Sequence, residues 1–309
     1  MGATTSGVVA VTGATGDVGG KTVEMLHDAG AHVRAVVRRP EQVAAFAARG
    51  IEARLADLGD EVAMTTALDG VDQLFLVTAA TRQQRQHGST GVRAAAAAGV
   101  RAIVHLSGGD AAEQSPMPWA KAIWEVDRDV RASGLERTIL HPSGFMTNLV
   151  SSAPALAHGV FPQTMGRGGI GWIDTADIAR VATTVLLTGE HVGAEPVLTG
   201  PELLDGRGVA RALSVGVGRR IRYLHLPSRV FRAVLRANGV PSWQAEGLRQ
   251  QFGRVARRGL DGVDVMTDEV ERITGTAPTS MSAWARANRS ALVGADQPAS
   301  ARQPVSGQP

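Results

Sequence analysis

A short apolar run followed at once by regularly spaced glycines most limits how this chain can fold. The run covers residues 8–12, and the glycines are Gly13, Gly16 and Gly19. A strand that ends in such a turn and leads into a helix is typical of the first βαβ unit of a dinucleotide-binding sheet. Gly13 permits the tight turn, Gly16 lets the backbone approach a pyrophosphate, and Gly19 lets helix and strand pack closely. The chain is therefore predicted to begin with a Rossmann-type unit.

Apolar strands and helical segments alternate through the first half of the chain. Helices are predicted over 21–29, 41–49, 88–98 and 119–132, and further strands over 32–37, 52–55, 73–77, 102–106 and 138–140. Such alternation predicts βαβ units around a parallel sheet, and right-handed crossovers make that sheet doubly wound. The expected fold class is α/β, a doubly wound parallel Rossmann sheet with a smaller mixed α/β C-terminal lobe.

The pattern changes after Pro142, and three regions are predicted. Residues 1–150 form the nucleotide-binding domain and residues 151–293 a substrate lobe, although the amphipathic helix at 174–188 is expected to pack back onto the first domain. Residues 294–309 are polar and rich in Pro, Ser and Gln, so they are predicted to be a disordered tail.

The end of the second strand predicts which dinucleotide is bound. NAD-binding sites usually place an acidic residue there, about 20 residues past the glycine turn. Here the strand ends in Arg38 and Arg39, with no acid. A guanidinium suits a phosphate dianion, so NADP(H) is favoured, with Arg38 as the better candidate; otherwise both arginines are simply solvated in a loop.

Residues after the other strands complete the predicted cofactor site. Asp57 and Leu58 are expected at the adenine, although Asp57 could instead cap a turn. Residues 77–79 are expected beside the pyrophosphate and nicotinamide ribose, or they are a plain strand end. The predicted cofactor-binding residues are Gly13, Thr15, Gly16, Asp17, Val18, Gly19, Arg38, Asp57, Leu58, Val77, Thr78 and Ala79.

Composition excludes several other classes of protein. There is no cysteine, so disulfides and thiolate metal sites are excluded, and no metal site is predicted. Net charge is +3 with the arginines scattered, which argues against a nucleic-acid partner. No apolar run approaches the roughly 20 residues that span a bilayer, so no membrane association is expected. The first seven residues lack a basic stretch, and a cytoplasmic location is expected.

The chain resembles the NmrA-like family, atypical members of the short-chain dehydrogenase/reductase superfamily. The resemblance covers nearly the whole chain up to about residue 292. It rests on Val11-Thr12-Gly13-Ala14-Thr15-Gly16, Ala35-Val36-Val37-Arg38, Val104-His105-Leu106-Ser107, residues 130–135, Thr138-Ile139-Leu140-His141-Pro142, Phe145-Met146-Thr147-Asn148, residues 171–174 and 177–179, residues 198–201 and residues 270–275. The family includes quinone and isoflavone-type reductases, epimerase-like proteins and NADP-sensing regulators, so the resemblance implies a cofactor more firmly than a reaction.

The catalytic dyad of typical short-chain dehydrogenases is absent. Those enzymes use a tyrosine as acid, with a lysine four residues later. The only tyrosine here is Tyr223, far downstream, and Met117 stands four residues before Lys121. An alcohol dehydrogenase would need a strong proton relay, whereas a quinone or enone gives a product anion that is already delocalised.

Three residues are candidates for the catalytic site. Ser107 ends the fifth strand and could hold a substrate carbonyl, or it is a turn residue. Lys121 could bond the nicotinamide ribose, or it is a solvated lysine. His141, where the family more often has arginine, could donate a proton or be a packed or ribose-facing histidine. His105 is expected to be buried without a role. Trp119, Trp124, Phe145 and Trp172 could line a flat aromatic pocket or belong to the core.

The leading hypothesis is an NADPH-dependent reductase of a quinone, enone or polycyclic carbonyl compound. Hydride transfer needs little from the protein beyond orientation and a dry pocket. The expected partner is thus a small molecule, aromatic or conjugated. One alternative is a non-enzymatic NADP(H)-binding redox sensor or regulator, and another is an isomerase or epimerase with resident NADP.

Overall fold

A parallel sheet of seven strands forms the centre of the computed structural model, which describes residues 7–165, 168–258 and 265–294. In spatial order the strands are β3 (Glu52–Leu55), β2 (Val33–Val37), β1 (Val8–Val11), β4 (Val71–Leu76), β5 (Ala102–Leu106), β6 (Glu136–Pro142) and β8 (Val197–Leu198). Every neighbouring pair is parallel. The chain reverses its direction of winding between β1 and β4, and open α/β sheets bind ligands at such a switch point.

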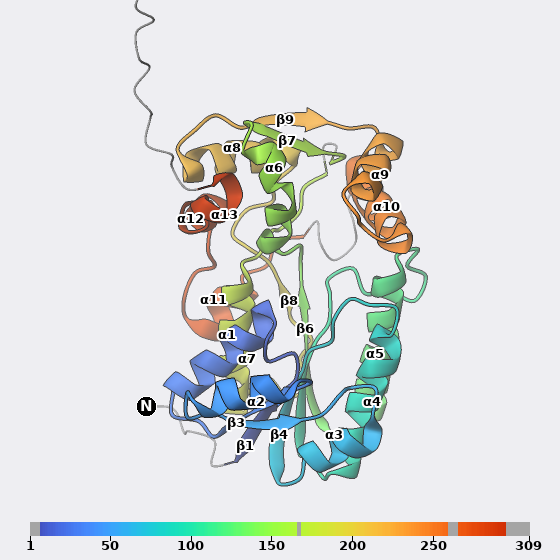
Figure 1. Cartoon of the computed structure of the whole chain (residues 1–309), viewed down its shortest axis with the longest axis vertical. Helices are drawn as coiled ribbons and strands as arrows, with labels where there is room; N and C mark the ends of the chain where they lie inside the picture. Colours follow the sequence, from blue (N-terminus) through green and yellow to red (C-terminus); the bar gives the residue numbers. More distant parts are fainter. Residues whose placement is uncertain (1–6, 166–167, 259–264, 295–309) are drawn as a thin grey trace, which may run out of the picture.

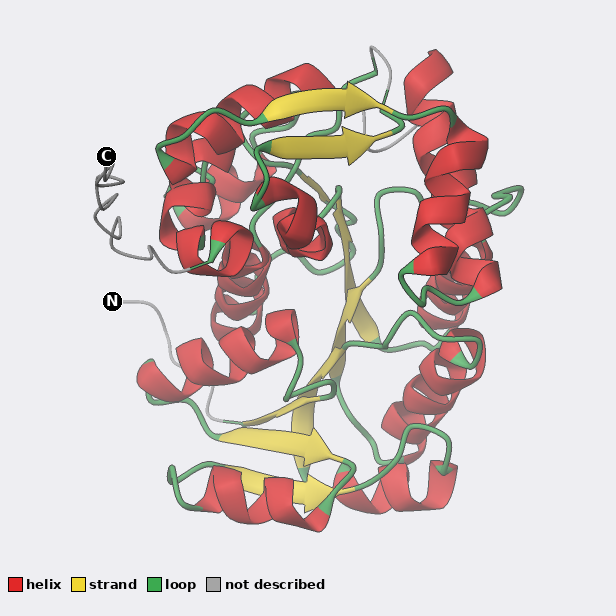
Figure 2. Cartoon of the chain, turned by 45° about the horizontal axis from the view of Figure 1, so that its top comes forward, coloured by secondary structure: helices red, strands yellow, loops and turns green. Residues whose placement is uncertain are grey.

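Helices cover both faces of the sheet (Figure 2). One face is covered by α1 (Asp17–Asp28) and α7 (Thr175–Thr188), which lie side by side. The opposite face is covered by α3 (Glu61–Ala67), α4 (Gln84–Ala97) and α5 (Pro118–Ala132). Two further helices pack at the periphery, α2 (Pro40–Ala47) against β3 and α11 (Glu269–Thr274) against α7. The predicted doubly wound α/β architecture is confirmed.

Burial on both faces explains why the strands read as continuous apolar runs. Val9 and Val11 of β1 pack into the core beside α1 and α7, while Ala10 between them packs into the core beside α3, α4 and α5. All three are fully buried. Successive strand residues point to opposite faces, so a strand with helices above and below needs apolar residues at every position.

The chain returns to the sheet after leaving it at β6. Asp174 caps α7, its Oδ1 accepting from the Ala176 amide at 3.1 Å, and the helix ends at Gly189, whose φ is +67°. β8 then pairs with the end of β6. α7 and β8 therefore belong spatially to the central sheet, although both lie beyond the expected boundary at residue 150.

A second group of elements lies above the sheet in Figure 1. It contains η1 (Met146–Ser152), α6 (Ala153–Leu156), β7 (Val160–Gln163), α8 (Gly206–Val217), β9 (Arg222–His225), α9 (Ser228–Ala237), α10 (Ser242–Arg258), α12 (Met281–Ala287) and α13 (Arg289–Val293). β7 and β9 form a separate parallel pair. A second core surrounds Trp284, Phe161 and Met281, which are buried.

Two negative findings hold for the described residues. None of the described helices is both long enough and apolar enough to cross a membrane. The described residues contain no group of His, Cys, Asp or Glu side chains that could hold a metal ion. The predicted disordered tail lies outside the described residues from position 295 onward.

Candidate cofactor and active site

The ends of β1 and β4 are joined by a pair of hydrogen bonds at the switch point. Thr12 Oγ1 donates to the Val77 carbonyl at 2.9 Å and accepts from the Val77 amide at 2.8 Å. The two bonds hold the glycine turn after β1 beside the segment that follows β4. Thr12 is buried, and Val77 is half-buried.

The glycine turn has the geometry that its sequence predicts. Gly13 has a φ of +60°, which favours glycine. A Cβ at Gly19 would lie 2.4 Å from the Gly13 carbonyl oxygen, so a side chain there would push helix and turn apart. Gly16 donates its amide to Gly13 at 2.8 Å and precedes α1. The turn thus brings the backbone to the mouth of the switch point without any side chain in the way.

The first turn of α1 offers unpaired amides. Within the described residues, the amides of Asp17, Val18 and Gly19 donate to no acceptor, and Gly16 provides no side-chain cap. The positive end of the helix dipole adds to their attraction for an anion. The Asp17 carboxylate pairs with Lys21, which also donates to Thr175 Oγ1 of α7 at 2.9 Å. Lys21 partly neutralises the one acid at this helix end.

A cavity of about 100 Å³ opens beside the turn at the ends of β2 and β3. Asp57 and Leu58 line it together with Arg38, and so do Val77 and Ala79 from the β4 side. Asp57 Oδ1 also accepts from the Gly59 amide at 2.7 Å, so this residue caps a turn and faces the cavity at once. The two residues predicted to lie at the adenine, Asp57 and Leu58, therefore line a cavity beside the glycine turn.

Arg38 and Arg39 differ in their partners. Arg39 Nε lies 3.3 Å from Glu41 Oε1. Arg38 lines the cavity, is exposed, and forms no ion pair with any described residue. Gln42 fixes this loop, because its Oε1 accepts from the backbone amides of both arginines at 3.3 and 3.1 Å. Arg38 is therefore the guanidinium left available for a phosphate.

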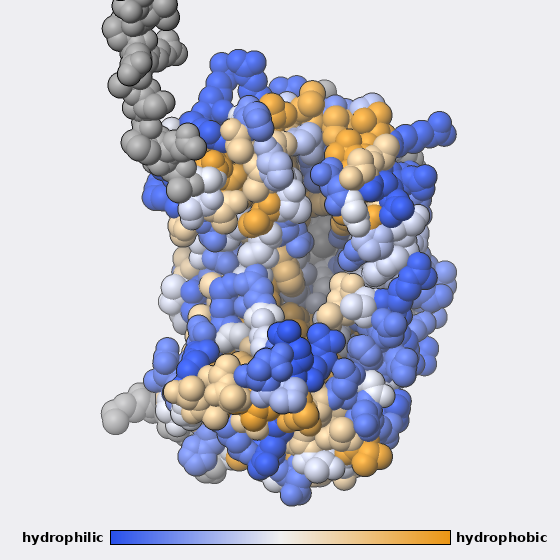
Figure 3. Space-filling model, in the orientation of Figure 1, coloured by the Kyte–Doolittle hydropathy of each residue, from blue (hydrophilic) through white to orange (hydrophobic). Residues whose placement is uncertain are grey.

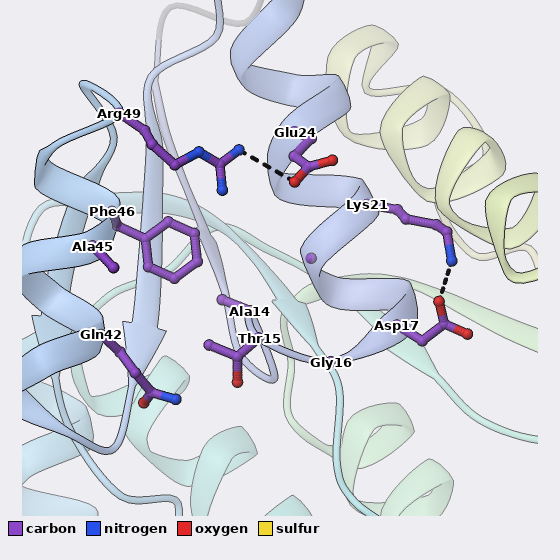
Figure 4. Close-up of a pocket in the computed structure, with 11 residues that line it drawn as sticks. Ala14, Thr15, Gly16, Asp17, Lys21, Glu24, Gln42, Ala45, Phe46 and Arg49 are labelled. Carbon is purple, nitrogen blue, oxygen red and sulfur yellow. Dashed lines mark hydrogen bonds and ion pairs between the residues drawn. The ribbon is translucent and has the colours of Figure 1, made fainter. Parts of the chain in front are cut away.

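A larger cavity of about 410 Å³ continues from the glycine turn into the space between α1 and α2 (Figure 4). It shares Ala14, Thr15 and Gln42 with the smaller cavity. At its far end Arg49 pairs with Glu24 at 3.2 Å, beside the ring of Phe46. Thr15 therefore lines both cavities. The sequence of the glycine turn does not reveal the larger cavity, because α2 forms one of its walls.

The segment after β4 carries an unsatisfied polar group. The Thr78 hydroxyl oxygen is buried and forms no hydrogen bond with any described residue. A buried hydroxyl without a partner is costly, and a bound polar molecule would satisfy it. This hydroxyl, the open amides of α1 and the glycines of the turn together fit a dinucleotide that runs along the carboxyl edge of the sheet.

Ser107 directly follows β5 and is bonded to a residue that the sequence reasoning missed. Its hydroxyl donates to Asp127 Oδ2 at 2.8 Å. Asp127 lies on α5 and is fully buried, and His105 Nε2 lies 3.3 Å from its other oxygen. The spacing of Ile123, Asp127 and Val130 on the apolar stripe of α5 is the signal that could have revealed a buried acid.

The other two catalytic candidates, Lys121 and His141, have surroundings that differ from those of Ser107. Lys121 is exposed on the first turn of α5, and Met117, at the position of the missing tyrosine, is buried in the second core. His141 ends β6 with Nδ1 3.2 Å from the Gly108 carbonyl and Nε2 3.7 Å from Glu195 Oε2. The pKa of Glu195 is held below its usual value mainly by its bond to Arg131. Both His141 nitrogens thus already face acceptors.

The only tyrosine is held in the second group of elements. The Tyr223 hydroxyl donates within the β7–β9 region, where the Gln163 and Met165 carbonyls accept from it. Burial raises the pKa of Tyr223 to about 12. A phenol so placed does not stand in for the tyrosine that is absent before Lys121.

A contact joins α10 to the loop after β5. Asp110 Oδ2 accepts from Trp119 Nε1 at 3.3 Å and from Gln251 Nε2 at 2.9 Å, and burial raises the pKa of Asp110. Trp119 meets Trp243 of α10 edge to face at 6.3 Å. Figure 3 shows the molecule hollowed near its middle, between the part that carries α2 and the part that carries α9 and α10.

The four aromatic candidates have separate surroundings. Trp119 packs with α10, and Trp124 lies under the guanidinium of Arg128 at 5.4 Å. Phe145 packs against the core beside α1 and α7, whereas Trp172 is buried in the second core. Trp119 is therefore the one of the four whose contacts join α10 to the loop after β5.

Comparisons with known proteins agree with this geometry. The family model described as "NmrA-like family" matches residues 5–285. An NAD(P)H azoreductase of Xenophilus azovorans is 32% identical over 286 residues, which are 92% of this chain and 99% of the relative. Quinone oxidoreductase 2 of Escherichia coli is 34% identical over 281 residues, 89% of this chain and 98% of the relative.

A solved structure resembles the whole fold. The NADPH complex of the NADPH-dependent quinone oxidoreductase of Escherichia coli has a TM-score of 0.81 and 31% identity, and the match covers 90% of this chain and 98% of that one. The chain belongs to the NmrA-like family. The resemblance found in the sequence motifs is thereby confirmed.

Proposed function

We propose that this protein is an NADPH-dependent reductase that transfers hydride to a quinone or a similarly conjugated acceptor. The observation that carries the proposal is the combination of an open phosphate-binding turn with the absence of a tyrosine at the sheet edge. Met117 is buried where the acid of an alcohol dehydrogenase would stand. An acceptor whose reduced form is a stabilised anion has no need of such a strong acid.

The matched relatives support both the reaction class and the cofactor. The chain is an NAD(P)H-dependent oxidoreductase that uses NADP(H), because relatives matched over nine-tenths of its length are named as such enzymes and one structure contains NADPH. A bound NADPH supplies the hydride. The protein binds and orients it through the amides of α1, the Thr78 hydroxyl and, for the additional phosphate, Arg38.

Conjugated substrates fit the names of the relatives and the shape of this chain. The matched enzymes are named for azo and quinone substrates. Figure 3 shows a hollow between the part of the molecule that carries α2 and the part that carries α9 and α10, and a planar acceptor is proposed to bind there. Ser107 follows β5, and His141 is the last residue but one of the neighbouring strand β6. Both are proposed to face the substrate at this edge of the sheet, with Lys121 at its margin.

The test is a panel of acceptors with NADPH. We expect NADPH oxidation with naphthoquinones and azo dyes, and none with aliphatic ketones, because only the conjugated acceptors give stabilised anions. The same panel with NADH should be much slower. Tight NADP⁺ binding without oxidation of NADPH by any acceptor would instead support a sensor, and would contradict the proposal.

A further inference from the structure

The second group of elements contains a stretch of chain that is rich in arginine and has no acid. Neither Asp nor Glu occurs between Asp205 and Glu246, a stretch that includes α8, β9 and α9. Its arginines are Arg207, Arg211, Arg219, Arg220, Arg222, Arg229, Arg232 and Arg236. These eight charges exceed the net charge of the whole chain, which is +3, so the residues outside the stretch carry a net charge of −5. The positive charge of the protein is therefore concentrated in this stretch.

Most of these guanidinium groups are not neutralised by a neighbouring acid. All of them except Arg219 are exposed. Within the ranges that the structure describes, Arg232 is the one that forms an ion pair, with Glu246 at 3.3 Å. Arg236 donates to the Val240 carbonyl at 2.7 Å, which leaves its charge uncompensated. Uncompensated surface charge attracts anions over about 8 Å at physiological salt.

The outer face of the β7–β9 pair is exposed and mostly apolar. Tyr223 packs against the second core, so Arg222 and Leu224 on either side of it point the opposite way. Both are exposed, Leu224 by 50%. Their register partners on β7 are Val160 and Pro162, which are half-buried. One arginine and three apolar side chains therefore share this face.

The helix that follows β9 is apolar on part of its exposed surface. Phe231 of α9 is buried, and its ring meets that of Phe252 of α10 edge to face at 5.9 Å. Val230 and Val234 are four residues apart, share one side of α9, and are 46% and 40% exposed. Arg229, which precedes Val230, is exposed as well. Figure 3 shows hydrophobic side chains gathered at the upper end of the molecule, over β9 and α9.

We propose that this part of the molecule docks on the anionic surface of a lipid bilayer. The docking surface, called here the basic apolar face, consists of Arg222, Leu224, Arg229, Val230 and Val234. Guanidinium groups bind the phosphates of lipid headgroups, and exposed aliphatic side chains enter the boundary between headgroups and acyl chains. β9 and α9 lie at the same end of the molecule (Figure 1), so one flat surface can contact both.

An anionic bilayer fits the basic apolar face better than a nucleic acid does. Nucleic-acid sites combine arginines with aromatic rings or with polar side chains that bind bases, whereas this face combines them with leucine and valine. A protein that binds the surface of a bilayer needs no spanning helix, so the lack of one among the described residues is no obstacle. The expectation of no membrane association therefore applies to spanning segments only.

Vesicle binding tests the proposal without cofactor or acceptor, so its outcome does not depend on the proposed reductase activity. The whole protein is sedimented with vesicles of phosphatidylcholine alone and with vesicles of phosphatidylcholine and phosphatidylglycerol in equal parts. We expect binding to the anionic vesicles only, and weaker binding as salt is raised, because salt screens the arginines. Absence of binding to the anionic vesicles, or equal binding to both kinds, would overturn the proposal.

Two double variants separate the charge of the face from its apolar contact. Arg222→Ala with Arg229→Ala should lower the partition coefficient roughly 25-fold, since each basic residue near an anionic surface contributes about fivefold. Leu224→Ser with Val230→Ser should lower it about tenfold, because two aliphatic side chains no longer leave water on docking. Thermal unfolding should be unchanged in both variants, since all four side chains are exposed. Wild-type partitioning in either variant would overturn the proposal.

The matched control is Arg54→Ala with Val62→Ser. Both residues are exposed, and β3 and α3, which carry them, lie at the end of the molecule away from β9 and α9 (Figure 1). This variant should bind anionic vesicles like the wild type, and a loss as large as in the other two would overturn the proposal. A single-stranded RNA is the second probe. RNA binding as tight as vesicle binding, lost only in the arginine variant, would identify a general polyanion site and would also overturn it.

Discussion

Two adjacent arginines of equal charge differ in what surrounds them. Arg39 is paired with Glu41, and Arg38 faces the cavity without an ion-pair partner among the described residues. A phosphate that bound Arg39 would have to compete with a carboxylate already in place. Arg38 meets no such competition, which is why we propose that it binds the additional phosphate of NADPH.

Arg38→Ala should weaken NADPH binding and leave NADH binding nearly unchanged. The loss should be about 10- to 100-fold in Kd, the equivalent of about 1.5–3 kcal/mol for hydrogen bonds to a charged group. Calorimetric titration with both cofactors measures it, and Arg39→Ala is the matched control. Equal loss for the two cofactors, or a larger effect in Arg39→Ala, would refute this assignment.

For single residues, the sequence predicts where the backbone needs a glycine better than it predicts which side chains will contact each other. The roles of Gly13 and Gly19 follow from spacing alone, because only residues without a Cβ allow that turn. Asp127 was missed, since its importance comes from His105 and Ser107 on a different element. Nothing local to α5 shows which strand residues its buried stripe will meet.

In the second core, α8 and α12 pack closely because α8 has a glycine at their contact. A Cβ at Gly216 of α8 would lie 2.5 Å from the Ala285 Cβ and 2.6 Å from the Ser282 carbonyl oxygen of α12. Gly253 of α10 has the opposite surroundings, since the nearest atom to such a Cβ is Ser228 Cβ at 4.0 Å. The two glycines therefore offer a matched pair.

Gly216→Ala should lower the free energy of unfolding by about 1–3 kcal/mol, the usual cost of overpacking a core. Gly253→Ala should raise it by about 0.5–1 kcal/mol, because alanine is the better helix former and has room. Thermal or denaturant unfolding of both variants measures the difference. Equal free energies of unfolding for the two variants would contradict the close packing of α8 against α12.

The sequence predicts a helix or strand where its local pattern matches the burial of that element in the fold. The strands of the central sheet are apolar at every position because both faces are buried, and their periodicity with the intervening helices identifies them. β7 was not predicted. It contains Pro162 and follows Gly159, and it exists because β9, about 60 residues later, supplies its partner. Such a pairing leaves no local signal.

The described part of the molecule has one core on each face of the sheet and a further core in the second group of elements, and the chain passes between the sheet and that group more than once. After β6 it builds η1, α6 and β7, returns with α7 and β8 to the sheet, and leaves again for α8. α11 packs on α7, and α12 on α8. The sheet and the second group of elements are therefore joined by more than one passage of the chain.

The proposed transfer of hydride from NADPH to a conjugated acceptor can be measured in a single turnover. NADPH and its 4,4-dideuterated form are each mixed with protein and excess naphthoquinone in a stopped-flow instrument. We expect one equivalent of cofactor to be oxidised per active site, more slowly with deuterium. Cofactor that binds yet is not oxidised faster than in protein-free solution would contradict it.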